Sequence, residues 1–235
     1  MSIGTLTAGG ARLQSVPYKS DDLPQKMAKY LWLPMLAMGL MAVVIGLGAA
    51  ISAGINIGDF FSASDAESLK DASTTMAWTS ATIFLGMAFI LSSITMLLVN
   101  IVRTLRDTGH DVQVAVRAGE VTQLRKPLTG RLIPVVMMMG LMIVIGAFVV
   151  GIVQADKLSG IPAGGIADTA TLQGQDLADY GTVQAFDAWV GPLRLFGLAT
   201  IFASIVLALR TIIQAIRFQG QRIQELAGGR FTPAA

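Results

Sequence analysis

Four long apolar stretches constrain this chain more than any other feature of its sequence. They cover residues 31–55, 77–102, 132–153 and 189–213. Each fits the roughly 20 apolar residues that a helix needs to cross the hydrocarbon core of a bilayer. Only 14% of the residues are charged, against roughly 25% in soluble domains, so the chain lacks a soluble shell that could enclose four such helices. We therefore predict an all-α integral membrane protein with four transmembrane helices.

The distribution of lysine and arginine predicts the side of the membrane that each connection faces. The first 30 residues, the segment 103–131 and the segment 210–235 have more basic than acidic residues, whereas the connections 56–76 and 154–188 are acidic. Cytoplasmic segments carry the excess of Lys and Arg. We expect both termini and the middle connection in the cytoplasm, no cleavable signal peptide, and a location in the cytoplasmic (inner) membrane of a prokaryote.

The sequence also repeats itself. The segment "MGLMAVVIG", which ends at Gly46, returns about a hundred residues later as "MGLMIVIG", which ends at Gly146. A shift of 111 residues places Trp78 on Trp189, and the match continues through the second and fourth stretches; a shift of 100 matches the first and third. Two hairpins that enter the membrane from the same side form a parallel repeat. We predict a pseudo-twofold four-helix bundle.

The repeat divides the chain into three parts. We expect a cytoplasmic N-terminal tail over 1–30 with a short surface helix that starts in "SDDLPQK". The first hairpin repeat covers 31–126 and the second covers 127–235. The second and fourth helices are expected to continue into the cytoplasm to about residues 118 and 227, since their apolar residues keep a helical spacing. The acidic connection 154–188, about 35 residues long, is expected to be an outer loop that covers the bundle or a partner.

Small and hydroxyl-bearing residues recur along the apolar stretches at spacings of four and seven. Such residues let transmembrane helices approach closely, because association in lipid depends on van der Waals contact. We predict that they form helix-packing seams within the chain; a pore lining or a contact with another subunit are the alternatives. The packing and assembly candidates are Gly46, Gly86, Ser93, Asn100, Gly146, Gly197 and Ser204.

One ionisable residue lies inside an apolar stretch and away from its cytoplasmic end. Arg194 comes five residues into the fourth stretch, and Asp187 precedes it by two helical turns on the same face. A charge at this depth needs a partner, so we expect Arg194 to reach outward to Asp187 or to a lipid phosphate, or to pair with another subunit or a bound anionic lipid. Trp78 and Trp189 are expected in the outer interfacial belt, where indole rings prefer to lie.

The chemistry of catalysis and cofactor binding has no support in this sequence. There is no cysteine and only one histidine, His110, which excludes sulfur-ligated metal centres and a bis-histidine haem within one chain. We therefore predict no enzyme, no catalytic residues, no metal and no cofactor, and nothing suggests nucleic acid as a partner.

Two functions of different classes remain. The first is a non-catalytic integral membrane subunit that assembles, in contact with membrane lipids, with other integral membrane subunits or as a homo-oligomer. The second is a small channel or transporter with a pore at the repeat axis or between protomers, lined by Thr79, Ser93 and Asn100. The lack of an intramembrane acid that could couple an ion opposes the second function.

Overall fold

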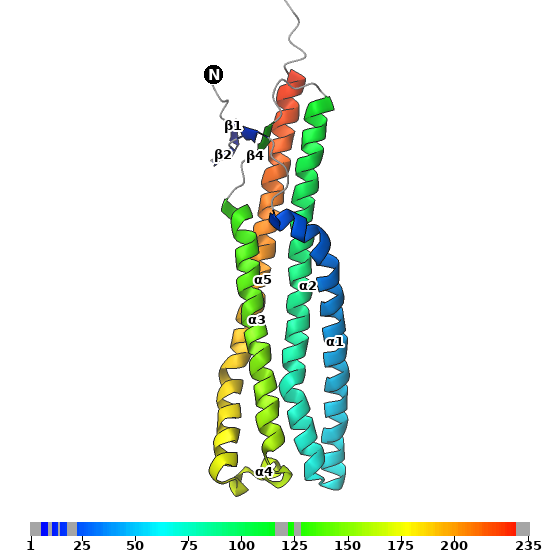
Figure 1. Ribbon diagram of the computed structural model, residues 1–235, viewed down its shortest axis with the longest axis vertical. Helices are drawn as coiled ribbons and strands as arrows, with labels where there is room; N and C mark the ends of the chain where they lie inside the picture. The colour runs from blue at the N-terminus through cyan, green and yellow to red at the C-terminus, as the bar shows by residue number, and fades with distance from the viewer. Residues whose placement is uncertain are drawn as a thin grey trace, which may run out of the picture. The chain divides into compact units, whose positions relative to one another are not determined.

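Four long helices make up most of the protein. The computed structural model describes residues 6–8, 11–13, 15–17, 23–115, 122–124 and 128–228 (Figure 1). The long helices are α1 (Leu23–Ala63), α2 (Ala66–Ala115), α3 (Leu128–Gly160) and α5 (Gly174–Gly228). Each is long and apolar enough to cross a membrane. The predicted all-α class and the four potential membrane-spanning helices are therefore confirmed.

The helices are longer than the apolar stretches that predicted them. They contain 41, 50, 33 and 55 residues in chain order, against the roughly 20 that a bilayer core requires. α1 starts at Leu23 with Pro24 in its first turn, where a missing N–H costs nothing, and it continues without a break. The expected short surface helix is therefore the beginning of α1 itself.

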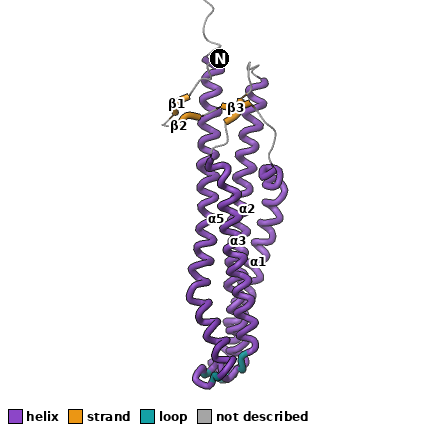
Figure 2. The backbone as a smooth tube through the Cα atoms, turned by 60° about the vertical axis from the view of Figure 1, so that its left-hand side comes forward, coloured by secondary structure: helices purple, strands orange, loops and turns teal. Residues whose placement is uncertain are grey.

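The described residues also form four strands of three residues each. β1 (Leu6–Ala8) pairs antiparallel with β2 (Ala11–Leu13), and β3 (Ser15–Pro17) pairs antiparallel with β4 (Thr122–Leu124) (Figure 2). The second pair joins a segment that precedes α1 to a segment between α2 and α3.

The chain divides into two compact units. Unit 1 comprises Met1–Trp32, Ile94–Val135 and Ala203–Ala235, and unit 2 comprises Leu33–Ser93 and Val136–Phe202. In α1 and α3 the boundaries lie beside Pro34 and Pro134. Proline inside a helix removes one backbone hydrogen bond, so both boundaries coincide with a weak point of the helix.

Unit 2 ends in two helix connections, which we call its turn end. Between α1 and α2 only two residues are not helical, and Ser64 adopts a left-handed conformation with φ of 54°. Asp65 caps α2, because its carboxylate accepts hydrogen bonds from the Glu67 N–H (3.2 Å) and the Ser68 hydroxyl (2.6 Å). These contacts allow an abrupt reversal of the chain.

The second connection corrects one prediction. The acidic segment 154–188 is not a loop: α3 continues to Gly160, α5 begins at Gly174, and the short α4 (Ala163–Ala167) and the 3-10 turn η1 (Thr169–Thr171) lie between them (Figure 2). The physical reason is that polarity ends the membrane span without ending the helix. Leu158, Ile161, Leu172 and Val183 form a small apolar core that holds this connection together.

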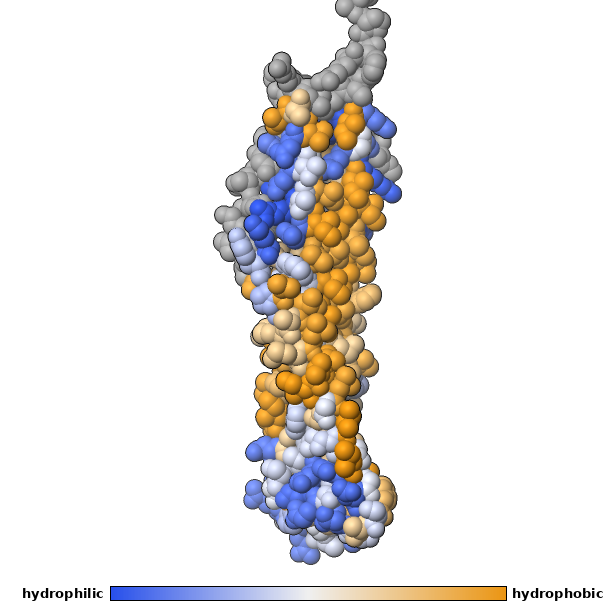
Figure 3. All heavy atoms as spheres, turned by 90° about the vertical axis from the view of Figure 1, so that its right-hand side faces the viewer, coloured by the Kyte–Doolittle hydropathy of each residue, from blue (hydrophilic) through white to orange (hydrophobic). Residues whose placement is uncertain are grey.

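A second apolar core lies deeper in unit 2. Ala88 of α2, Leu141 and Val144 of α3 and Ile201 of α5 are buried against one another. On the outward surface, apolar side chains cover much of the helices, and hydrophilic side chains gather at the turn end (Figure 3). A surface of this kind suits a lipid environment.

In unit 1, polar side chains join the helices. The hydroxyls of Thr95 and Ser204 lie 3.0 Å apart between α2 and α5, and those of Thr129 and Thr211 lie 3.2 Å apart between α3 and α5. The side-chain amide of Gln219 on α5 donates to the backbone carbonyl of Leu105 on α2.

Candidate functional site

The most unusual residue of unit 2 is a buried arginine. Arg194 of α5 is only 7% exposed, and its Nη1 donates to the Ser80 hydroxyl of α2 at 2.7 Å. The guanidinium carbon lies 6.0 Å from the centre of the Phe84 ring, within cation–π range. A charged group is therefore held between two helices by one neutral hydroxyl and one aromatic face.

The expected ion pair between Arg194 and Asp187 is not formed. The Asp187 carboxylate accepts a hydrogen bond from Nε2 of Gln154 at 2.9 Å, and the same amide donates to the Val183 carbonyl at 3.3 Å. Gln154 is only 1% exposed. It therefore ties α3 to α5 and fixes the position of the Asp187 carboxylate.

A glycine of α3 makes room for this arrangement. A Cβ at Gly151 would lie 2.7 Å from Cβ of Ala81 and 3.3 Å from Nη2 of Arg194. Contacts this short are nearly absent from real side chains, so α3 and α2 approach here only because both residues are small. The close approach brings α2, α3 and α5 together around the guanidinium.

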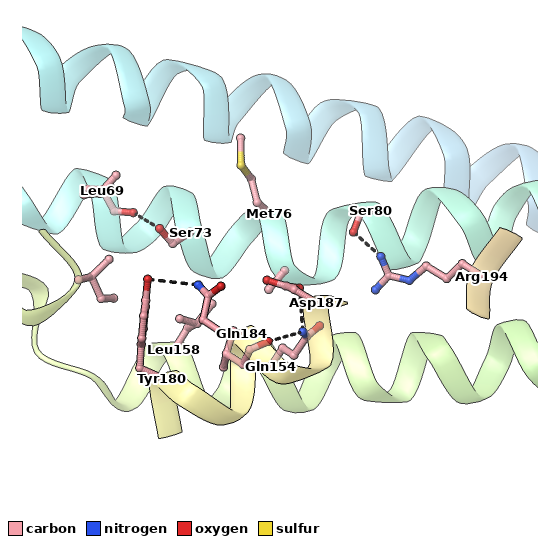
Figure 4. A pocket seen from close by; sticks show the side chains of 13 residues that line it. Leu69, Ser73, Met76, Ser80, Gln154, Leu158, Tyr180, Gln184, Asp187 and Arg194 are labelled. Carbon is pink, nitrogen blue, oxygen red and sulfur yellow. Dashed lines mark hydrogen bonds between the residues drawn. The ribbon is translucent and has the colours of Figure 1, made fainter. Parts of the chain in front are cut away.

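These groups line one cavity of about 360 Å³ in unit 2 (Figure 4). Its polar lining comprises Ser73, Ser80, Gln154, Tyr180, Gln184, Asp187 and Arg194; its apolar lining includes Leu69, Leu158 and Ile166. Figure 4 shows the guanidinium of Arg194 directed toward Ser80, while the Gln184 amide donates to the Tyr180 hydroxyl at 3.2 Å. The cavity volume lies within the roughly 300–1,000 Å³ of typical small-ligand sites.

Asp179, an acidic residue near the turn end, is neutralised within the chain. Lys157 of α3 forms an ion pair with Asp179 of α5. In the described part of the chain no carboxylate lies within ion-pair distance of Arg194. Arg194 and Asp187 therefore line the cavity as two opposite charges without a mutual ion pair.

Two of the predicted packing glycines lie at close helix crossings. A Cβ at Gly86 would be 2.8 Å from the backbone oxygen of Gly39, where α1 meets α2, and a Cβ at Gly197 would be 3.2 Å from that of Gly140, where α3 meets α5. Sequence reasoning missed the partner glycines, Gly39 and Gly140. Both stand in the repeated "MGLM" motif, which was the available signal.

The remaining glycine candidates behave differently from each other. Gly46 is buried, and a Cβ there would lie 2.5 Å from Cγ1 of Ile83 on α2. Gly146 is exposed, and no atom lies within 4 Å of its Cβ position. Gly146 therefore takes part in no close helix crossing among the residues that the structure describes.

The predicted hydroxyl and amide residues lie on α2 and α5. Ser93 and Ser204 are buried, and the Ser93 hydroxyl donates to the Ile90 carbonyl of its own helix at 2.7 Å. Asn100 is half-buried, and its backbone carbonyl accepts from the Thr104 hydroxyl at 3.2 Å. Of these residues, only Ser204 makes a side-chain hydrogen bond to another helix, with Thr95.

Trp78 and Trp189, the tryptophans predicted to lie in an interfacial belt, belong to unit 2 and lie outside the cavity lining. Trp78 of α2 is half-buried. Trp189 of α5 is 44% exposed and packs edge-on against Phe186, with 5.8 Å between ring centres. Neither position tests the prediction of an interfacial belt.

Sequence reasoning found Arg194 and Asp187 but missed their partners, Ser80 and Gln154. The only signal for these two was a polar side chain close to one end of an apolar stretch. Among the described residues, no group of three or more His, Cys, Asp or Glu side chains could hold a metal ion.

Comparisons of this chain with protein-family models, with curated proteins and with solved structures found no match.

Proposed function

We propose that this chain is a non-catalytic integral membrane subunit that assembles with other membrane proteins or with copies of itself. The observation that carries this proposal is the open surface of α1. Only 11% of the residues in the most apolar segment of α1 are buried, against 28% to 39% in the other three long helices. The first helix thus offers most of its apolar surface to lipid or to a partner.

One glycine on this surface is suited to a close helix contact. Gly48 lies among Met41, Val44, Ile51 and Ile55, which share one side of the helix by their spacing of three, four and seven residues. We call these five residues the α1 outer face. The four larger side chains are more than 60% exposed, and no atom lies within 4 Å of a Cβ at Gly48. Small residues at such positions let a second transmembrane helix approach closely.

The proposal includes a duplicated hairpin with both termini in the cytoplasm. Two crossings with matching contacts support the duplication: a Cβ at Gly39 meets the Gly86 oxygen at 2.8 Å and the Ile90 nitrogen at 2.9 Å, and a Cβ at Gly140 meets the Gly197 oxygen at 2.7 Å and the Ile201 nitrogen at 2.9 Å. Gly86 and Gly197 are 111 residues apart, and Gly39 and Gly140 are 101 apart. The contacts favour a shift of 101 over 100 for the first and third helices.

The alternative of a channel has one observation in its favour, the polar cavity of unit 2. The cavity reaches Ser80 and Arg194, and two helical turns further along α2 and α5 lie Ala88 and Ile201 of the apolar core. A solute moving through unit 2 would have to pass this close-packed layer. The packing therefore favours a subunit over a channel.

The test compares two leucine substitutions on exposed helix surfaces. Gly48→Leu adds a side chain to the α1 outer face without a clash inside the chain, and Ala199→Leu adds one to an exposed position of α5. We expect Gly48→Leu to abolish co-purification of the native partner, or the homo-oligomer on a native gel, and Ala199→Leu to retain it. Unchanged assembly of Gly48→Leu, together with solute flux through the wild-type protein in proteoliposomes, would favour the channel.

A further inference from the structure

The cavity of unit 2 contains an arginine that uses only part of its hydrogen-bonding capacity. A guanidinium has five N–H donors in a planar fork. In Arg194 one terminal nitrogen donates to Ser80, whereas Nε is buried and has no hydrogen-bond partner. A buried donor without an acceptor is costly, and more so when it carries charge. The site therefore lacks an acceptor for Arg194.

The shape of the guanidinium indicates which chemical group would be its acceptor. The guanidinium fork matches the paired oxygens of a carboxylate or a phosphate. Arg194 lies in a helix that is long and apolar enough to cross a membrane, five residues from Trp189, which is about 7.5 Å along a helix axis. Helix side chains lean toward the N-terminus, which directs Arg194 toward the turn end. In a membrane, the oxyanion present at highest concentration near such a position is the phosphate of a lipid headgroup.

The charges of the cavity lining limit which type of headgroup it can bind. Among the described residues of the lining, Arg194 and Asp187 are the charged ones, and their charges sum to zero. Asp187 accepts one hydrogen bond, from Gln154 to Oδ1, and its second carboxylate oxygen can accept another donor. A ligand of complementary charge is a zwitterion with a phosphate at one end and a hydrogen-bonding ammonium at the other.

We propose that this cavity binds phosphoethanolamine, with the phosphate on the guanidinium of Arg194 and the ammonium on the carboxylate of Asp187. The ligand is the headgroup of a phosphatidylethanolamine lipid, whose phosphodiester and ammonium charges sum to zero, or the free compound, which offers the same two groups with a more negative phosphate. The amide of Gln154 holds Asp187 in position for the ammonium. A choline headgroup fits less well, because its quaternary nitrogen has no N–H to donate.

The test measures binding to the full chain, purified in detergent and stripped of lipid. The probes are short-chain phosphatidylethanolamine, the matching phosphatidylcholine, and free phosphoethanolamine, each titrated by native mass spectrometry. We expect the wild type to bind phosphatidylethanolamine more tightly than phosphatidylcholine. Arg194→Gln should weaken this binding by about tenfold or more, which is the usual effect of losing hydrogen bonds to a charged group.

A matched control removes a different charge from the same helix. Arg210 is exposed, so Arg210→Gln should bind as the wild type does. Asp187→Asn should abolish the preference for ethanolamine over choline while the phosphate contact persists. If Arg194→Gln does not fold, Arg194→Lys keeps the charge without the fork, and it should bind phosphatidylethanolamine more weakly than the wild type and Arg210→Gln do; an affinity equal to theirs would overturn the proposal.

The outcomes separate the two sources of the ligand. Free phosphoethanolamine that binds as tightly as the lipid assigns the site to a soluble ligand, and binding of the lipid alone assigns it to the bilayer; either result supports the site. Equal affinities of Arg194→Gln and Arg210→Gln overturn the proposal, as does a wild type that does not distinguish ethanolamine from choline. These results do not depend on whether the chain assembles through the α1 outer face.

Discussion

The close crossing of α1 and α2 leads to a prediction that depends on two atoms of the backbone. A Cβ at Gly86 would lie 2.8 Å from the Gly39 oxygen and 2.9 Å from the Val43 nitrogen. Backbone atoms cannot rotate away as a side chain can, so in Gly86→Ala the two helices must separate. Overpacking of this kind costs about 1–3 kcal/mol in protein cores. For a chain of this size that corresponds to a decrease in melting temperature of roughly 2–12 °C.

The assay is thermal unfolding of the purified protein in one detergent, followed by circular dichroism. Gly48→Ala is the control, because no atom lies within 4 Å of its Cβ position and alanine favours a helix over glycine; its melting temperature should equal or exceed that of the wild type. Gly140→Ala should behave as Gly86→Ala does, since two backbone atoms, the Gly197 oxygen and the Ile201 nitrogen, would also lie close to its Cβ, at 2.7 and 2.9 Å. A Gly86→Ala variant as stable as Gly48→Ala would refute the close crossing.

Three further predictions concern other parts of the chain. Ser80→Ala removes the acceptor of Arg194 and should destabilise the lipid-free protein by about 1–3 kcal/mol, measured by thermal unfolding, whereas Ser73→Ala, whose hydroxyl bonds only to the carbonyl of Leu69 in its own helix, should change little. The Ser68 hydroxyl and the Glu67 N–H lower the pKa of the Asp65 carboxyl below its usual 3.8. The stability that the wild type gains over Asp65→Ala should therefore be complete above pH 3.8 and decline as the pH falls through the lowered pKa. A stability difference that stays constant under acid would contradict the cap. Single cysteines at Gly9, His110 and Ala234, in a chain without native cysteine, should resist an impermeant external thiol reagent, and labelling of any of them would disprove the cytoplasmic termini and middle segment.

The four helices that could span a membrane could be predicted from sequence, because the length and composition of a stretch decide whether it can cross a bilayer. The ends of the helices could not. Residues around Asp156 and Asp176 are polar enough to end the apolar stretch, yet they remain helical in α3 and α5. Polarity determines where a helix leaves lipid, whereas its end depends on local caps such as the one at Asp65.

The partners of the candidate site were less accessible to sequence reasoning. Arg194 was evident because one charge stands within an apolar stretch, but its contact with Ser80 depends on how α2 and α5 are rotated against each other. A change of one residue in the alignment of two helices turns a side chain by about 100°. For the same reason, the sequence alone does not distinguish a shift of 100 between the first and third helices from the proposed shift of 101, which the contacts of Gly39 and Gly140 favour.

The most direct measurement of the proposed subunit role is photo-crosslinking in native membranes. A photoreactive amino acid replaces Val44 on the α1 outer face or, as a control, Leu195 on α5; these side chains are 67% and 61% exposed. We expect Val44 to yield one discrete protein adduct, identifiable by mass spectrometry and absent when Gly48→Leu is added, and Leu195 to yield adducts with lipid only. Adducts of Val44 with lipid alone would contradict assembly through α1.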